Sequence, residues 1–186
     1  MAVPRDDLSL AFVNTRYWRG RERPTETLAA PGDLAAWWTA ETGEKIPAPE
    51  PAFFAAALEL REGLHRVFAA RAGEAVPPAA DVERLNAALA QAPPRRRLAW
   101  AGDGLDWHME AAGAWEGVRA RLLWSAADLL TGPRRARVRQ CDNPECRYLF
   151  LDASKAGNRR WCDMASCGNR AKAHRHYRRR RAAEAG

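Results

Sequence analysis

Four cysteines lie in the last 46 residues of this 186-residue chain, at Cys141, Cys146, Cys162 and Cys167. Their spacing, C-x4-C-x15-C-x4-C, gives two pairs separated by a connector, which is the arrangement of a structural zinc site. Two disulfides or four buried free thiols are the alternatives, and neither is common for such spacing in a cytoplasmic chain. We expect one structural Zn²⁺ held by the four cysteines. His174 and His176 could each replace a cysteine, but four thiolates already complete a tetrahedral site.

The second cysteine pair also predicts local structure. Residues five apart in one α-helix point about 140° apart, so both cannot face the same ion. Cys162 must therefore precede a helix, Cys167 must lie in its first turn, and Asp163 can cap it. The connector, residues 147–161, is typical of a strand, a turn and a short strand. The expected module is treble-clef-like, and its few apolar side chains make its folding depend on the metal.

Positive charge is concentrated in the same module. The whole chain carries a formal charge of +7, but residues 134–186 contain 15 Lys and Arg against 5 Asp and Glu. The remaining 133 residues are therefore slightly acidic. A basic module on an acidic body is the charge distribution expected of a protein that meets a polyanion.

The helix after Cys167 is expected to carry the contacts to that polyanion. Asparagine and basic residues read base edges and hold phosphates in double-stranded DNA. A solvated helix end, where a few cations complement the helix dipole, is the alternative. The candidate DNA-binding residues are Arg159, Arg160, Asn169, Arg170, Lys172, Arg175, His176, Arg179 and Arg180.

The segment CDNPECRYLFLDASKAGNRRWCDMASCGNRAKAHRHYRRRR, residues 141–181, resembles the CGNR zinc finger, which is named for the motif at residues 167–170. In the body, AFVNTRYW, DLAAWW and LELREGLHRVF resemble the ABATE domain that usually precedes this finger. The resemblance implies a stress-induced transcriptional regulator of bacteria whose finger binds DNA. It also implies that the four cysteines are zinc ligands and that Asn169, Arg170 and Lys172 face DNA.

The body, residues 1–133, is expected to be mainly helical with a small β-hairpin. Helical periodicity and proline or glycine boundaries predict helices in residues 31–43, 51–73, 77–94 and 111–132. Alternating Leu98, Trp100, Leu105 and Trp107 around AGDG predict a hairpin, and we expect the tryptophans to be core residues. The fold class is thus α+β, with an ABATE-like domain over 1–133 and a zinc finger over 134–186. If the two fold separately, a Cys162→Ser change should unfold only the finger.

The stretch FVNTR places Asn14 and Thr15 between apolar neighbours. Such polar groups need hydrogen-bond partners, which local backbone can supply. Alternatively, Asn14, Thr15 and Arg61 line a pocket for a small-molecule effector, although Arg61 could equally be a buried ion-pair partner. The body would then be a ligand sensor or a dimerisation module.

Motifs that the sequence lacks narrow the range of functions that we expect. The chain shows no glycine-rich phosphate loop, nucleophile elbow or HExxH motif, so we do not expect an enzyme. It has no signal peptide or transmembrane pattern, and we expect a cytoplasmic protein. The leading hypothesis is a DNA-binding regulator acting as a homodimer, because one short helix buries little surface. An RNA- or protein-binding zinc module without operator specificity is the alternative.

Overall fold

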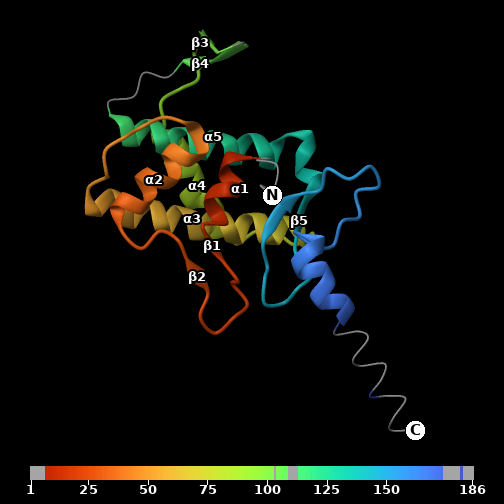
Figure 1. The fold of residues 1–186 in the computed structure, drawn as a ribbon. Coiled ribbons are helices and arrows are strands. Elements are labelled where there is room, and N and C mark those ends of the chain that lie inside the picture. Colours follow the sequence, from red (N-terminus) through yellow and green to blue (C-terminus); the bar gives the residue numbers. More distant parts are fainter. Residues whose placement is uncertain (1–6, 103, 109–112, 174–180, 182–186) are drawn as a thin grey trace.

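A computed structural model describes residues 7–102, 104–108, 113–173 and 181 of the chain (Figure 1). The body contains five α-helices and two short antiparallel strand pairs within these residues. Its elements are α1 (Leu8–Val13), β1 (Arg16–Tyr17), β2 (Thr25–Glu26), α2 (Pro31–Thr42), α3 (Pro51–Ala72), α4 (Ala79–Gln91), β3 (Arg97–Ala101), β4 (Gly104–His108) and α5 (Ala114–Thr131). The C-terminal part contains the 3₁₀ turn η1 (Pro133–Arg137), β5 (Val138–Gln140), β6 (Leu149–Leu151) and the π-helical turn η2 (Met164–Gly168).

The predicted fold class and the four long predicted helices are confirmed. Proline begins α2 and α3 at a position whose backbone N–H has no partner in the helix, and Gly43 ends α2 in the left-handed conformation at φ 79°. The helices bury one continuous core in which Phe12, Trp38, Phe68 and Leu123 are fully enclosed. Apolar packing of the helix faces therefore holds the body together.

The strands β5 and β6 belong to the same core. Val138, Leu149 and Leu151 are buried at 1%, 0% and 6% exposure and join the cluster formed by the body helices. The two strands are antiparallel, with Val138 opposite Leu151, and they lie against α1 and α3 (Figure 1). The cysteine-rich module is thus packed onto the body and shares its hydrophobic core.

This pairing corrects the expected connector hairpin. Leu149–Leu151 pairs with Val138–Gln140, which precedes the first cysteine, and residues 159–161 form no strand. Asp152 ends β6 and is buried at 1% exposure, where its carboxylate accepts hydrogen bonds from the backbone N–H groups of Ser154 and Arg159. Because the carboxylate binds the backbone on both sides of the turn, the connector closes without a second strand.

The hairpin β3–β4 forms as predicted, but its tryptophans are not core residues. Leu98 lies opposite Trp107, and Trp100 lies opposite Leu105, so all four share one face of the hairpin. Their exposures are 50%, 45%, 73% and 62% in that order. The hairpin stands away from the helices beyond α5 (Figure 1), and no element of the described chain covers this face completely.

Candidate metal centre and nucleic-acid interface

The four cysteine Sγ atoms lie within 4.8 Å of one another. Two of the separations are 3.6 Å, between Cys146 and Cys162, and 3.8 Å, between Cys162 and Cys167. A tetrahedral zinc ion with Zn–S bonds of about 2.3 Å requires sulfur atoms about 3.8 Å apart. Disulfide sulfurs would be about 2 Å apart, so all four thiols are free and spaced for one ion.

Three of the thiols are linked by hydrogen bonds. Hydrogen bonds from the thiols of Cys146 and Cys162 lower the pKa of Cys141, and donating those bonds raises the pKa of both donors. A bound cation would favour the thiolate form of these three cysteines. Four sulfur donors of this kind suit zinc and leave no open coordination position, so the site is structural.

Two turns bring the cysteine pairs together. The turn of residues 141–147, which we call the knuckle, carries Cys141 and Cys146, and Asn143 accepts backbone hydrogen bonds that close it. Asp163 caps η2 as predicted, accepting hydrogen bonds from the N–H groups of Ala165 and Ser166. Cys162 precedes this turn and Cys167 lies within it, as the spacing predicts, although the turn is π-helical where an α-helical one was expected.

Gly168 lies close to two side chains. A Cβ at this position would lie 2.7 Å from the Met164 sulfur and 3.4 Å from the Trp161 ring. A side chain there would therefore require the half-exposed Met164 side chain to shift. A short helix of residues 169–173 follows directly.

The remaining two residues of the CGNR motif point in different directions. Asn169 is exposed and its amide donates to the Ala165 carbonyl at 3.1 Å, within its own helix. The Arg170 guanidinium lies 4.8 Å from the centre of the Trp18 ring, so it contacts the body. Arg21 stacks on the same ring at 3.9 Å. Trp18, with a left-handed φ of 53°, is thus in contact with two guanidinium groups.

The other candidate DNA-binding residues differ in whether their side chains are engaged within the protein or exposed. Arg159 donates to the carbonyls of Trp161 and Cys162 and packs on Phe150, so it braces the finger internally. Arg160 pairs with Asp142 at 2.6 Å but remains exposed. Lys172 is exposed beside Asn169 on the helix surface. Arg175, His176, Arg179 and Arg180, and the alternative ligand His174, lie outside the described residues.

The candidate ligand residues of the body are engaged with the protein itself. Asn14 forms two hydrogen bonds with Leu149 of β6, donating to its carbonyl at 2.7 Å and accepting from its N–H at 3.1 Å. Arg61 is 2% exposed and bonds both carboxylate oxygens of Glu26 at 2.6 Å as well as the Thr15 hydroxyl at 3.1 Å. These contacts account for all three residues without a ligand, and Arg61 is a buried ion-pair partner.

A groove of about 750 Å³ does lie between α3, α4 and α5, with Leu60, Leu85 and Leu122 in its lining. Arg61 and Glu26 border it, but Asn14 and Thr15 are not among its lining residues. The structure therefore brings Thr15 and Arg61 together as a pair and places Asn14 at a different contact.

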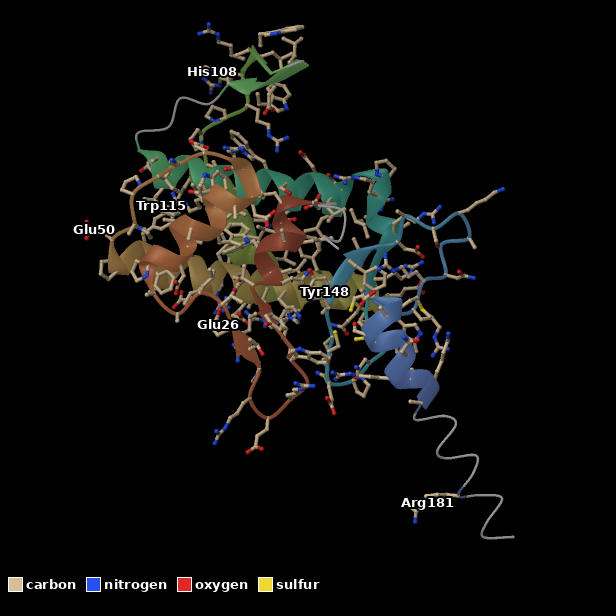
Figure 2. The ribbon with its side chains drawn as sticks, in the orientation of Figure 1. Glu26, Glu50, His108, Trp115, Tyr148 and Arg181 are labelled. Carbon is tan, nitrogen blue, oxygen red and sulfur yellow. The ribbon has the colours of Figure 1, made fainter. Side chains whose placement is uncertain are left out.

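Sequence reasoning missed the contact that joins the body to the knuckle. The backbone N–H groups of Arg19 and Gly20 donate to the carbonyls of Cys146 and Glu145 at 3.3 and 3.0 Å. A Cβ on Gly20 would lie 1.7 Å from the Pro144 carbonyl oxygen, so only glycine fits there. Figure 2 shows Tyr148 at this junction, between the body helices and the finger helix. The signal in the sequence is the glycine of YWRG, directly after FVNTR, where a close backbone contact requires a residue without a side chain.

These features define a class of protein: a helical body that carries a tetrathiolate zinc finger packed against it, with a basic helix leading away from the metal. Residues 6–133 match the family model ABATE, described as "Putative stress-induced transcription regulator", and residues 137–180 match the CGNR zinc finger. The chain belongs to the ABATE family, and the predicted resemblance is confirmed. No curated protein matches the chain. Among the described residues, no helix has the length and apolarity needed to cross a membrane.

Proposed function

We propose that this protein is a cytoplasmic transcriptional regulator, not an enzyme, that binds double-stranded DNA through the helix following Cys167. The observation that carries the proposal is the fixed position of this helix. The zinc site holds its first turn, Cys167 and Gly168 face inward, and Asn169 and Lys172 are exposed on its surface. The concentration of Lys and Arg in residues 134–186 supplies the charge that such a helix needs to bind DNA.

Binding measured over a salt series tests this proposal. Lys172→Ala should weaken binding to all duplexes and reduce the slope of log K against log salt by about one, as expected for a lost phosphate contact. Lys45→Ala, an exposed lysine of the body, is the matched control and should leave the slope unchanged. Asn169→Ala should reduce discrimination at one base pair by about 1–3 kcal/mol against a duplex selected from random sequence.

The alternative function, an RNA- or protein-binding zinc module without operator specificity, is tested with the same protein. If random duplexes bind as tightly as any selected sequence at every salt concentration, operator recognition is ruled out. Tighter binding to single-stranded or duplex RNA would favour the RNA-binding alternative.

We further propose that the regulator is a homodimer joined through the exposed face of the β3–β4 hairpin. The face formed by Leu98, Trp100, Leu105 and Trp107 exposes on the order of 500 Å² of apolar surface. Two such faces in contact would bury about 1,000 Å², the lower limit for a stable interface. An isolated two-stranded hairpin is marginal in water, so a second copy would also stabilise the hairpin itself.

The dimer proposal is tested by molar mass in solution. Light scattering should find a dimer at micromolar concentration, and Leu98→Ser with Trp100→Ser should convert it to a monomer. Val76→Ser removes an apolar side chain that is 91% exposed and lies outside the hairpin, so this change should leave the dimer intact. A monomeric parent protein would reject the proposal.

A further inference from the structure

A second recess lies where the body meets the finger, and its lining is strongly basic. It has a volume of about 590 Å³, and its floor and walls include Arg16, Arg19, His65, Arg66, Gln140 and Arg147. The first four come from β1, the segment after it and α3, whereas Gln140 and Arg147 belong to β5 and the knuckle. We call it the junction recess. Both parts of the protein therefore contribute side chains to one cavity.

The positive charge in the junction recess is only partly neutralised. Glu62 is the one acidic residue among its lining residues in the described chain, and Arg19 and Arg61 already occupy its carboxylate at 2.6 to 3.2 Å. Arg16 reaches Glu62 only at 3.7 Å, which is too long for a good hydrogen bond. Arg66 is paired with Asp81 by two bonds of 2.6 and 2.7 Å.

Arg147 is the other incompletely satisfied cation. Within the described residues its guanidinium makes one hydrogen bond, from Nε to the Pro144 carbonyl, and no ion pair. Its backbone has a left-handed φ of 53°, which a non-glycine residue seldom adopts without surrounding constraint. The knuckle thus presents an available guanidinium at the edge of the recess.

Buried polar atoms give a second, independent sign of a missing partner. Among the described residues, three buried side-chain nitrogens lack a hydrogen-bond partner, and two of them belong to this recess, Arg19 Nε and His65 Nε2. The Arg19 side chain is only 10% exposed. Burying such a group without a partner is unfavourable, so a small shift of these side chains that brings them into contact with an acceptor in the recess would be favoured.

The electrostatic environment of His65 agrees with this interpretation. Burial is the largest cause that lowers the pKa of His65, to about 4, and the charges of Arg19, Arg66 and Arg16 lower it further against the opposing effect of Glu62. The imidazole is therefore neutral at pH 7, and it can donate one hydrogen bond from Nε2. The same positive potential that disfavours its protonation would favour an anion.

We propose that the junction recess binds a small organic oxyanion, a carboxylate or phosphate ester, held by Arg16, Arg19, His65 and Arg147. The volume exceeds what an inorganic ion needs and falls in the range of small-molecule sites. Ala69, Val76 and Pro78 in the lining offer an apolar wall for the rest of such a molecule.

The location of this site has a consequence for regulation, which rests on the proposed DNA-binding function. The same Arg19 that lines the recess donates its backbone N–H to the carbonyl of the zinc ligand Cys146. A ligand bridging Arg19 and Arg147 would therefore contact both sides of the junction between body and finger. If its binding changes the affinity for DNA, DNA must change the affinity for the ligand by the same factor.

The test uses phenyl phosphate as the probe and the zinc-loaded full chain as the protein. Affinity is measured by NMR titration at constant ionic strength, with sodium chloride replacing the probe as the reference. We expect saturable binding that shifts the His65 imidazole signals. Arg147→Ala and Arg16→Ala should each weaken it by about tenfold or more, as expected for one lost charge-assisted hydrogen bond.

Two controls make the result decisive. Lys45→Ala removes an equal charge outside the recess and should leave the affinity unchanged, whereas equal weakening by all three variants would indicate only general attraction and overturn the proposal. The Arg16 variant changes no residue of the knuckle, so it remains informative if Arg147→Ala disturbs the zinc site. No saturable binding of phenyl phosphate by the parent protein would also overturn it.

A competition arm separates a free ligand from the phosphates of DNA. Phenyl phosphate should still bind in the presence of saturating duplex DNA. Full displacement by the duplex would show that the recess holds the DNA backbone and would overturn the small-molecule proposal. Failure of DNA binding itself would leave the probe titration unaffected, so the two proposals fail independently.

Discussion

Asn14 is expected to contribute more to stability than any other exposed or half-buried polar residue near the junction. Its two bonds to Leu149 are the side-chain contact that ties α1 to strand β6. In Asn14→Ala both the N–H and the C=O of Leu149, which is 0% exposed, lose their partner. An unsatisfied buried backbone group costs about 1–3 kcal/mol, so the loss of partners for both groups should lower the unfolding free energy by about 2–6 kcal/mol.

The size of this effect can be measured by scanning calorimetry of the zinc-loaded protein. For a chain of this length each kcal/mol corresponds to about 2–4 °C, so the melting temperature should fall by roughly 4–24 °C. Asn86→Ala, at an exposed position of α4, is the matched control and should be neutral or slightly stabilising. A shift for Asn14→Ala within about 2 °C of the control would refute the role assigned to these two bonds.

Three further predictions concern the metal, a buried ion pair and pH. Removing zinc with a chelator should lower the melting temperature of the whole chain. The reason is that the three core side chains of β5 and β6 represent about 5–8 kcal/mol of burial, which is comparable with the total stability of a typical domain. An unchanged tryptophan signal from the body would contradict this prediction, and chelator preloaded with zinc is the control. Arg61→Met should lower the unfolding free energy in urea by about 1–3 kcal/mol, because the charge-assisted hydrogen bonds of Arg61 to Glu26 are lost while the Glu26 carboxylate stays partly solvated, whereas Arg84→Met, at a 75% exposed cation, should have little effect. Stability should fall as the pH drops from about 6.5 to 4, because the unfolded state binds a proton at His65 that the folded state does not. His65→Gln should flatten this part of the pH profile while His108→Gln, at an exposed position, should not, and identical profiles for the two variants would exclude His65 as the cause.

The zinc site and the long helices could be predicted from the sequence because their signals are local. Thiol spacing, proline boundaries and helical periodicity each depend on a few neighbouring residues. The position of Cys162 before a turn and Cys167 within it followed from helix geometry alone.

The pairing of β6 could not be predicted in the same way. LFL contains only apolar residues, so its pattern does not show whether a following or a preceding strand is its partner. Asn14, 135 positions earlier, binds the backbone N–H and C=O of Leu149, and a partner so distant in the sequence leaves no local signal in LFL. Because β5 and β6 lie in the body core, we now predict that unfolding of the finger also destabilises the body.

The exposed β3–β4 hairpin shows a different limit of prediction from the sequence. Alternation of Leu98, Trp100, Leu105 and Trp107 correctly indicated two paired strands with one apolar face. Periodicity shows that residues share a face, but it does not show what that face packs against. The assumption that tryptophans are buried was wrong here, because Trp100 and Trp107 are 73% and 45% exposed.

The close contact at Gly20 offers a way to change the orientation of the zinc finger relative to the body. The smallest enlargement of that residue, Gly20→Ala, places a methyl group where the Pro144 carbonyl oxygen now lies, so the knuckle must shift away from Arg19. The substitution adds no charge and touches neither a cysteine nor an arginine. A single methyl group would thus change the position of the knuckle, and with it the position of the two cysteines that the knuckle carries.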